Sequence, residues 1–577
     1  MNIKEFLNSQ VLDVIRALGY EVKDALVSRS NRPELSDYQS NAAMPLAKSA
    51  HKPPREIATQ IATELEKKDF ISKVSVDGPG FINFRLSPSL WDKAFMDIFI
   101  QGDEFGASDI GKGEKINVEF LSANPTGPLH VGHSRGAIFG DAVARLLSKV
   151  GYDVTKEYYV NDFGKQVDVL AESVYWRYEE LFGRHMGEKI PEGRYPGDYV
   201  IPVAQSIKDL DGDKWLNKTD WLEYFKTKSI EQMLKLIQAD AAKLGIQFDV
   251  FTSEKALVEA GAVDKTVQQM QDMNLLYRGV LPKPKGEESE DWAPVEQTLF
   301  RAKDFGDDRD RVILRSDGTK TYFTSDIAYH VDKFNRGFHQ MIDIFGADHG
   351  GYVKRLKAAI KALTNAKASL DIALCQVVSL QKDGKPFRMS KRAGNFVLVD
   401  DILDEIDADA FRLFMLTKSA DSQMSFDLAK TKEQSKDNPV FYIQYALART
   451  YSVLNTYEKM FGTLSTQNDL NVNYAESSES ERILIQKMLD LSHVIEVAAQ
   501  NKAPHLLAGY LYEIAGLFHS LWTQGAKSGH RFVDAEDIVQ TNKNLTLILA
   551  LQQVLRNGLN TLGINPKTKM ERVEETD

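Results

Sequence analysis

Cysteine is almost absent from this chain of 577 residues, since Cys375 is the only one. A single cysteine excludes an internal disulfide and every zinc site that needs two or more thiolates. The segment around it, SLDIALCQVVSLQ, is largely apolar, so we interpret Cys375 as a small core residue. We expect the protein to work in a reducing compartment.

Long hydrophobic runs are also missing. No segment offers the roughly 18 uninterrupted apolar residues that a membrane-spanning helix requires. The N-terminal segment carries acidic and polar residues where a signal peptide has its apolar core, and it lacks the arginine- and serine-rich bias of a transit peptide. Apolar residues instead recur at helical spacing from Ile3 to Leu18, which predicts a folded helix. We therefore expect a cytoplasmic protein.

An excess of positive charge is absent as well. The formal net charge is -11, so the overall charge gives no sign of a nucleic-acid partner, and any basic surface must be local. Hydrophobic residues make up 43% and charged residues 27%, which is ordinary for a globular protein. The length corresponds to roughly three or four domains.

The first predicted domain, residues 1–108, has mixed α/β character. Helices are expected over about 38–50 and 54–68, and the alternating residues around the turn Asp77–Gly80 predict a strand–turn–strand. Ser87 and the proline after it predict the start of a further helix, as an N-cap and a first-turn proline.

The second predicted domain, residues 109–431, alternates strands and helices. Strands are expected over 116–120, 152–160, 340–348 and 371–380, with helices between them. This order is typical of a doubly wound, Rossmann-type parallel sheet that binds a nucleotide. Residues of about 175–310 are mostly helical and charged, which predicts an insertion, and residues 432–577 predict an all-α domain.

The strongest motif is EFLSANPTGPLHVGHSRG, residues 119–136. His130 and His133 lie where a strand passes into a helix, and the backbone N–H groups of a helix start favour phosphate. Gly132 between them permits a close backbone approach. The pair is also compatible with a metal site or a purely structural role, but no third ligand is evident nearby and no HExxH pattern occurs.

A second motif, KPFRMSKRAGNFV, occupies residues 385–397 after the last predicted strand. Arg388, Lys391 and Arg392 with glycine nearby predict a mobile cationic loop that clamps polyphosphate. Such a loop alone is usually a solvated surface. Its occurrence together with the His-x-Gly-His junction favours a nucleotide site.

These two motifs resemble the two signatures of class I aminoacyl-tRNA synthetases. The departures are Val131 for isoleucine, Arg388 for the first lysine of the second signature, and Arg392 for its final serine. The first two keep shape or charge, whereas the third does not.

Five segments resemble the arginyl-tRNA synthetase family in particular, and with the N-terminal domain they extend the likeness to nearly the whole chain. They are SANPTGPLHVGH (122–133), SDGTKTYFTSDIAYH (316–330), GADHGGYVKRL (346–356), NPVFYIQYALAR (438–449) and LGINPKTKM (562–570). The resemblance implies that the all-α domain binds the anticodon. It also implies ATP-dependent attachment of L-arginine to tRNA(Arg) through arginyl-adenylate, with transfer to the 2′-hydroxyl.

The same resemblance assigns roles at the nucleotide site. His130, His133 and Lys391 are the expected catalytic residues, since the reaction needs positioning and charge stabilisation rather than a side-chain nucleophile. Magnesium is expected to arrive with ATP, and no zinc is expected. The further residues expected to bind ATP are Gly132, Gly346, Asp348, His349, Met389, Ser390 and Arg392.

A guanidinium substrate calls for planar carboxylates that accept a two-pronged hydrogen bond. Asp326 and Tyr322, four residues apart at a predicted helix start, supply a carboxylate and a hydroxyl; alternatively, Asp326 merely caps that helix. By resemblance, Glu119, Ser122 and Asn124 complete the arginine pocket. A charged, planar pocket of this kind rejects analogues without an editing step.

The resemblance also implies tRNA contacts. Phe81 and Asn83 match the positions at which the N-terminal domain of this family contacts a D-loop nucleotide, although Phe81 is also compatible with a plain core position. Tyr445, Arg449 and Met570 are expected to face the anticodon. We expect a monomer, and in this family tRNA must be present before arginine is activated.

Two other functions stay open. One is a nucleotidyltransferase or ligase that shares the His-x-Gly-His junction but uses no tRNA; the long helical C-terminal stretch argues against it. The other is a catalytically silent RNA-binding relative, against which the intact His130, His133 and Lys391 argue.

Overall fold

The computed structural model describes residues 2–282, 295–382, 384–386, 397–433, 435, 438–463, 470, 473–529 and 531–570. The chain forms two compact units. One combines Met1–Ser108 with Gln434–Asn501 and Leu506–Asp577, and the other consists of Asp109–Glu433 and Lys502–His505. Among the helices of the described residues, none has the length and apolar character needed to cross a membrane.

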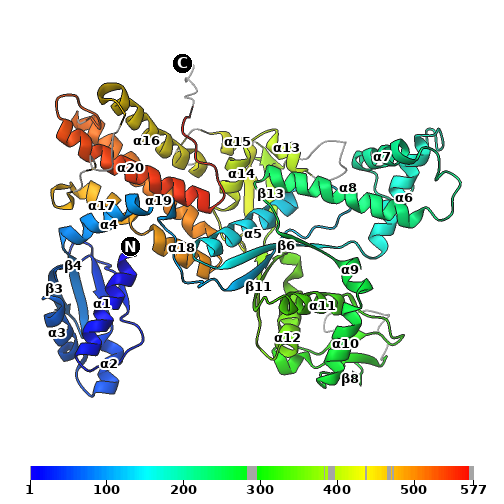
Figure 1. The fold of residues 1–577 in the computed structure, drawn as a ribbon, viewed down its shortest axis with the longest axis horizontal. Coiled ribbons are helices and arrows are strands. Elements are labelled where there is room, and N and C mark those ends of the chain that lie inside the picture. Colours follow the sequence, from blue (N-terminus) through cyan, green and yellow to red (C-terminus); the bar gives the residue numbers. More distant parts are fainter. Residues whose placement is uncertain are drawn as a thin grey trace. The chain divides into compact units, whose positions relative to one another are not determined.

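A parallel sheet forms the centre of the unit Asp109–Glu433. Its strand order is β12 (Ser369–Cys375), β11 (Gln340–Gly346), β5 (Lys115–Glu119), β6 (Asp153–Val160) and β7 (Val250–Ser253), and every pairing is parallel (Figure 1). The chain begins at the central strand β5, builds outward to β7, and then returns to the other side of β5 with β11. Such a reversal leaves a crevice beyond the carboxyl ends of β5 and β11, where ligands bind in this fold. The predicted Rossmann-type sheet is confirmed.

Strand β5 is buried on both faces. Ile116 and Val118 lie on one face, and the polar Asn117 and Glu119 on the other are buried as well. Helix α5 (Val131–Lys149) follows β5 and packs closely on it, since a Cβ on Gly140 would lie 2.3 Å from the Phe120 side chain. This close packing fixes the start of α5 beside the end of β5.

The prediction of one mostly helical insertion over about 175–310 is wrong. This stretch does contain the end of α6 (Lys165–Glu180), α7 (Ile201–Asp211) and α8 (Leu222–Lys243), and later α9 (Glu254–Glu259) and α10 (Ala262–Asp272). It also supplies the fifth strand of the central sheet, β7, and two strands of an antiparallel sheet, β8 (Leu276–Gly279) and β9 (Gln297–Phe300), which β10 (Arg311–Leu314) completes. Each of these strands has only four residues, too few for an alternating pattern to be recognised.

The predicted strand 371–380 is in fact two strands. Residues Ser369–Cys375 form β12, whereas β13 (Val378–Lys382) joins a separate sheet with β14 (Lys385–Pro386) and β15 (Met424–Asp427). Helices α11 (Tyr322–Asn335) and α12 (Val353–Leu363) share a hydrophobic core with α10 and the antiparallel sheet.

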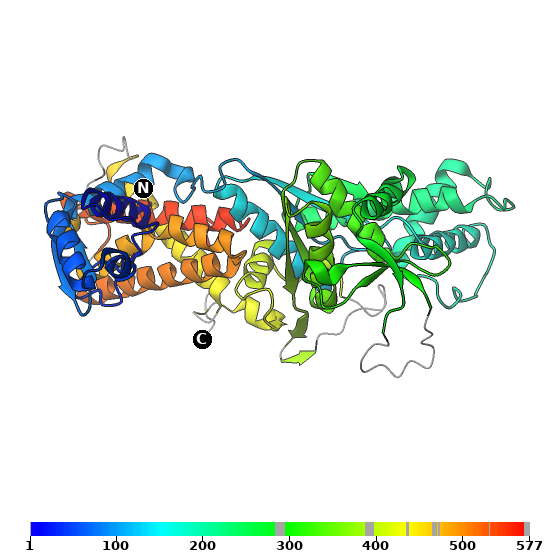
Figure 2. The same ribbon diagram turned by 90° about the horizontal axis from the view of Figure 1, so that it is seen from below.

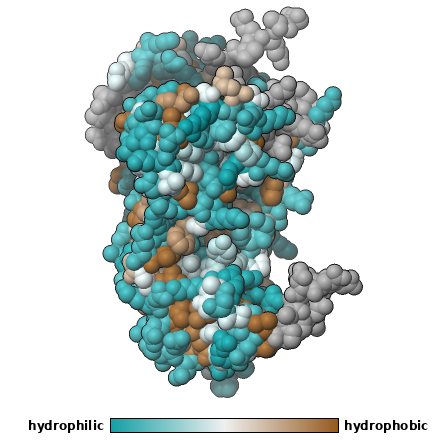
Figure 3. All heavy atoms as spheres, turned by 90° about the vertical axis from the view of Figure 1, so that its right-hand side faces the viewer, coloured by the Kyte–Doolittle hydropathy of each residue, from teal (hydrophilic) through white to brown (hydrophobic). Residues whose placement is uncertain are grey.

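In the face seen in Figure 3, hydrophobic residues are interspersed among hydrophilic ones.

The N-terminal part of the other unit is a four-stranded antiparallel sheet with three helices. The strand order is β1 (Val27–Arg29), β2 (Tyr38–Ser40), β4 (Phe81–Leu86) and β3 (Ile71–Asp77), and the helices are α1 (Ile3–Ala17), α2 (Ala43–Ala50) and α3 (Pro54–Leu65). The predicted hairpin around Asp77–Gly80 is confirmed, but residues 38–40 form β2 rather than the start of a helix. Ser87 caps α4 (Pro88–Gln101) as predicted, accepting from the Leu90 N–H.

Helices make up the C-terminal part of the chain, as predicted. They are α16 (Pro439–Phe461), α17 (Glu479–Met488), α18 (Leu491–Gln500), α19 (Pro504–Ser528) and α20 (Ile538–Thr561), drawn from yellow to red in Figure 2. Helix α20 packs along α16 and also against α4. The N-terminal and C-terminal segments therefore share one compact unit, whereas residues 1–108 were expected to be self-contained.

Candidate functional site

His130 and His133 lie at the start of α5. Nδ1 of His130 accepts a hydrogen bond from the Gly132 N–H at 3.1 Å, and Nδ1 of His133 accepts one from the His130 N–H at 3.3 Å. The two rings stack with their centroids 3.7 Å apart. A Cβ on Gly132 would lie 2.9 Å from the His130 ring, so a larger residue at this position would displace that ring. The two imidazoles therefore face one way, as their spacing predicts.

The backbone contacts fix the protonation of both rings. Because each Nδ1 accepts an N–H, the neutral rings carry their proton on Nε2. Burial lowers the pKa of His130, and burial together with the neighbouring His130 lowers the pKa of His133 to about 4. Both rings are thus neutral near pH 7 and present Nε2–H donors at a helix N-terminus, which suits an anionic phosphate oxygen.

The cationic loop with Arg388, Met389, Ser390, Lys391 and Arg392 lies outside the described residues. The segment that follows it is bonded to the backbone on either side of His130. Val131 donates its N–H to the Val397 carbonyl at 2.9 Å, and Val399 donates to the Leu129 carbonyl at 3.0 Å. Lys391 precedes this anchor by six residues, which span at most roughly 20 Å when extended.

The residues just after β5 form the next part of the site. Leu121 and Ser122 have φ angles of 70° and 31°, a left-handed backbone that is strained for side chains other than glycine and is found preferentially at functional sites. Ser122 Oγ donates to Oε1 of Glu119 at 3.0 Å and accepts the Tyr159 N–H at 3.1 Å. Asn124 is exposed, and its Oδ1 accepts a hydrogen bond from Asn161 at 2.9 Å.

Asp326 and Tyr322 lie on the first two turns of α11. Tyr322 is 77% exposed. The N-cap of α11 is Thr321, so the interpretation of Asp326 as a helix cap is wrong. Oδ2 of Asp326 accepts a hydrogen bond from the Tyr352 hydroxyl. Burial raises the pKa of Asp326 to about 6.

The sequence analysis missed a second carboxylate, Glu254. This side chain is buried at the first residue of α9, directly after β7. Burial, followed by repulsion from Asp326 and Asp162, raises its pKa to about 7. The Ser253–Glu254 pair that opens α9 was the available signal, because serine at an N-cap followed by glutamate marks a helix start. A cation bound beside these two carboxylates would favour the ionised form of both.

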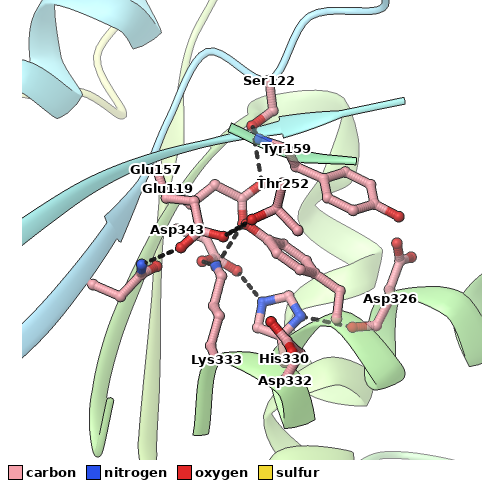
Figure 4. Close-up of polar contacts among 12 residues, drawn as sticks. Glu119, Ser122, Glu157, Tyr159, Thr252, Asp326, His330, Asp332, Lys333 and Asp343 are labelled. Carbon is pink, nitrogen blue, oxygen red and sulfur yellow. Dashed lines mark hydrogen bonds and ion pairs between the residues drawn. The ribbon is translucent and has the colours of Figure 1, made fainter. Parts of the chain in front are cut away.

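Behind these carboxylates lies a buried ionic network (Figure 4). The Nζ atom of Lys333, which is 0% exposed, lies 2.6 Å from Oε2 of Glu119 and 3.1 Å from Oδ1 of Asp343. The His330 ring contacts Oδ2 of Asp343 at 2.7 Å and the Asp326 carbonyl at 2.7 Å. Both ring nitrogens of His330 face oxygen acceptors, so the ring is an imidazolium. Burial is the largest single effect and acts to lower the pKa of His330, but Asp343 and Glu119 together raise it.

Glu119, His330 and Asp343 also place ligand atoms within 4.8 Å of one another, close enough to suggest a metal site. The Lys333 ammonium, however, already bonds two of the three residues. Burial would raise the pKa of Asp343, yet Lys333 and His330 hold it at about 2. Within the described residues, we therefore interpret this cluster as a set of ion pairs centred on Lys333 rather than as a metal site.

Gly346, Asp348 and His349 lie at the carboxyl end of β11, the neighbour of β5. Gly346 ends the strand, and the other two lie in the turn η4 (Ala347–Tyr352). The Asp348 and His349 side chains are 81% and 60% exposed and lie 3.6 Å apart. The structure thus brings these residues, the histidine pair and the carboxylates to one edge of the sheet.

The predicted contacts in the N-terminal part lie on the β3–β4 hairpin. Phe81 is 37% exposed, so the interpretation of Phe81 as a core residue is wrong. Asn83 lies two residues along β4, on the same outward face, and donates to Oδ2 of Asp77 at 2.9 Å.

In the C-terminal helices, Arg449 is held between two aromatic rings. Its guanidinium carbon lies 4.3 Å from the Tyr445 ring centroid and 4.9 Å from that of Trp522, a residue that the sequence analysis missed. Met570 is half-buried near the end of the described chain. The Gln444 side chain holds the preceding segment on α16 through the Asn565 carbonyl at 3.2 Å and the Lys567 N–H at 3.0 Å.

Three family models match consecutive parts of the chain. The arginyl tRNA synthetase N terminal domain matches residues 2–86, the catalytic domain of class I (R) tRNA synthetases matches 95–187 and 216–434, and the DALR anticodon binding domain matches 443–570. The sheet, the histidine junction and the matched catalytic model together define a class I aminoacyl-tRNA synthetase.

Similar proteins narrow this class. An arginine–tRNA ligase of Roseobacter denitrificans is 47% identical over 92% of this chain and 92% of its own, and one of Jannaschia sp. is 46% identical over 98% of both. The fold matches that of the Thermus thermophilus arginyl-tRNA synthetase with a TM-score of 0.72 at 21% identity, covering 98% of this chain and 100% of that one. The chain belongs to the arginyl-tRNA synthetase family.

Proposed function

We propose that the chain attaches L-arginine to tRNA(Arg) through arginyl-adenylate in the crevice beyond β5 and β11. The observation that carries this proposal is the pairing, at one sheet edge, of two neutral imidazoles at a helix start with carboxylates of raised pKa. The imidazoles suit the phosphates of ATP, and the carboxylates suit a guanidinium.

Asp326 and Glu254 receive the guanidinium of arginine. Burial and mutual repulsion make their negative charge costly until a cation arrives, and a guanidinium supplies that cation together with paired N–H donors. The exposed Tyr322 ring covers the side chain. Ser122 and Asn124, just after β5, hold the α-amino and carboxylate groups, and Glu119 lines the pocket beside Ser122.

ATP lies across the start of α5, with adenosine against Gly346, Asp348 and His349. The arginine carboxylate attacks the α-phosphorus, and pyrophosphate leaves. His130 and His133 donate their Nε2–H groups to the phosphate oxygens beside Gly132. Lys391 neutralises the departing pyrophosphate, supported by Met389, Ser390 and Arg392 of the same loop. The bonding of Val397 and Val399 beside His130 supports this role, because it limits how far Lys391 can lie from the histidines.

The transfer step uses tRNA, whose terminal 2′-hydroxyl attacks the adenylate. Residues 1–108 contact the outer corner of the tRNA through Phe81 and Asn83, and residues 432–577 contact the anticodon through Tyr445, Arg449 and Met570. The exposed Phe81 ring and the Arg449 guanidinium stacked on Tyr445 suit unpaired bases. Residues 109–431 supply the catalytic domain.

Magnesium accompanies ATP, no zinc takes part, and the protein works as a cytoplasmic monomer. Metal analysis of the purified protein and activity titrated with magnesium test the first two predictions. Light scattering of the free protein tests the third.

Charging of total tRNA with each labelled amino acid tests the proposal. We expect label on tRNA with arginine alone, at the 2′-position, and none after His133→Ala. Activity without tRNA as acceptor favours the nucleotidyltransferase alternative, and binding without charging favours the silent RNA-binding relative.

A further inference from the structure

Tyr352 connects the two halves of the site. It is the last residue of η4, the turn that begins after Gly346 and carries Asp348 and His349. Its hydroxyl donates a hydrogen bond to Oδ2 of Asp326 on α11. The segment expected to hold adenosine is thus joined to the carboxylate expected to hold arginine.

Packing fixes the position of this hydroxyl. The Tyr352 ring meets the Phe323 ring edge-on, with centroids 5.9 Å apart and an interplanar angle of 90°. The Arg355 guanidinium carbon lies 4.7 Å from the centroid of the Tyr352 ring. A half-buried ring held by both neighbours loses little freedom when its hydroxyl binds the carboxylate.

We propose that Tyr352 is a positioning residue for arginine recognition, whose hydroxyl orients the Asp326 carboxylate and keeps it ionised. This inference rests on the proposed role of Asp326 as a guanidinium acceptor. A two-pronged guanidinium contact requires the carboxylate plane to be set, and a donor fixed on Oδ2 sets it. Each carboxylate oxygen accepts two hydrogen bonds, so Oδ2 still has room for a substrate N–H.

The electrostatic surroundings make this hydrogen bond matter. Ionisable groups on several elements interact electrostatically with Asp326: His330 on α11, Glu119 on β5, Asp343 on β11, Glu254 on α9, Tyr159 on β6 and Tyr352 on η4. Burial is the main reason that the pKa of Asp326 rises to about 6, and the Tyr352 hydrogen bond is the main effect opposing it. In Figure 4 the Asp326 carboxylate points away from the His330 ring, which bonds the Asp326 carbonyl instead.

Removing the hydroxyl therefore acts in a defined direction. A hydrogen bond to the ionised form favours that form, so its loss raises the pKa of Asp326. The carboxylate then protonates at a higher pH, and arginine binding fails earlier as the pH falls. A role in packing alone weakens binding by the same factor at every pH.

The test is Tyr352→Phe in the full-length protein, with arginine affinity measured by calorimetry between pH 5.5 and 8.5. We expect arginine affinity to be about fivefold weaker at pH 8. The acid limb, which is the fall in arginine affinity at low pH, should shift upward by about one pH unit, while ATP affinity changes less than about twofold. The phenylalanine keeps the ring contacts, and a thermal melt confirms folding. An acid limb at the wild-type pH, with or without a uniform loss of affinity, overturns the proposal.

Two further variants separate this inference from the proposed function. Tyr277→Phe, on β8, removes a comparable hydrogen bond from a tyrosine hydroxyl to a carboxylate, that of Asp310 at 2.8 Å, and should leave the pH profile of arginine binding unchanged. Asp326→Asn tests the pocket itself. If Asp326→Asn binds arginine normally, both the pocket and the role of Tyr352 are wrong. If it loses arginine while Tyr352→Phe keeps the wild-type limb, only the role of Tyr352 is wrong.

Discussion

The Nζ atom of Lys333 lies 2.6 Å from Oε2 of Glu119, and both side chains are buried. The two residues lie on α11 and β5, so the ion pair joins the helix that carries Asp326 to the strand that ends at Glu119, shortly before Ser122. The buried ammonium group of Lys333 therefore holds the two parts of the proposed arginine pocket in place relative to each other.

Lys333→Met should destabilise the catalytic unit strongly. Removing the ammonium leaves the buried Glu119 with uncompensated charge, which costs roughly 3–5 kcal/mol, whereas Asp343 keeps His330 as a partner. Urea unfolding measures the change. Lys235→Met breaks the ion pair between Lys235 and Glu231, whose side chains are 60% and 44% exposed. This control should change the free energy of unfolding by less than about 1 kcal/mol. Equal effects of the two variants would contradict a structural role for the network.

Asp326→Asn should weaken arginine binding far more than ATP binding. The guanidinium loses its charge partner in a buried site, at a cost of roughly 3–5 kcal/mol. Equilibrium dialysis with each ligand measures both affinities. If arginine affinity stays within about threefold, or under ~0.7 kcal/mol, the pocket assignment fails.

Arginine affinity should fall as the pH drops from 8 to 5.5. The pKa values of Glu254 and Asp326 are raised to about 7 and about 6, so both carboxylates become protonated within this window and no longer attract the guanidinium. Bound arginine favours the ionised forms, so its binding releases protons in this range. Calorimetry in buffers of different ionisation enthalpy measures that release. In Glu254→Gln, the fall in arginine affinity near pH 7 should disappear. If that fall is unchanged in this variant, Glu254 does not belong to the pocket.

Lys391→Ala should slow adenylate formation and leave tRNA binding nearly intact. The lysine is expected to meet pyrophosphate chiefly as charge develops, which is typical of a transition-state contact. Single-turnover kinetics and a tRNA filter-binding assay separate the two effects. Weaker ATP binding with unchanged turnover would argue against this role.

Features determined by neighbouring residues could be predicted from the sequence. The cap at Ser87, the turn at Asp77–Gly80 and the shared orientation of His130 and His133 all depend on residues within a few positions of one another. The parallel sheet followed from the alternation of longer strands and helices.

Features that depend on distant residues could not be predicted from the sequence. Strand β7 has four residues, and only its pairing with β6 identifies it. The pKa of Glu254 is raised first by burial and then by Asp326, which is far away in the sequence, and Lys333 finds its partners on β5 and β11. Nothing in the sequence near Glu119 shows that a helix covers its face of β5 with a lysine.

Pyrophosphate exchange with each amino acid, with and without tRNA, tests the central claim most directly. Val397 and Val399, which follow Lys391 in the chain, are bonded beside His130, so a shift of this segment when tRNA docks would change the position of Lys391 relative to ATP, a population shift driven by tRNA. We predict that arginine is the only amino acid that supports exchange, and that it does so only when tRNA is present. A chain truncated near residue 432 should stay inactive at saturating ATP and arginine. Exchange supported by another amino acid would contradict the proposed function. Robust exchange by the truncated chain would show that tRNA acts only as the acceptor.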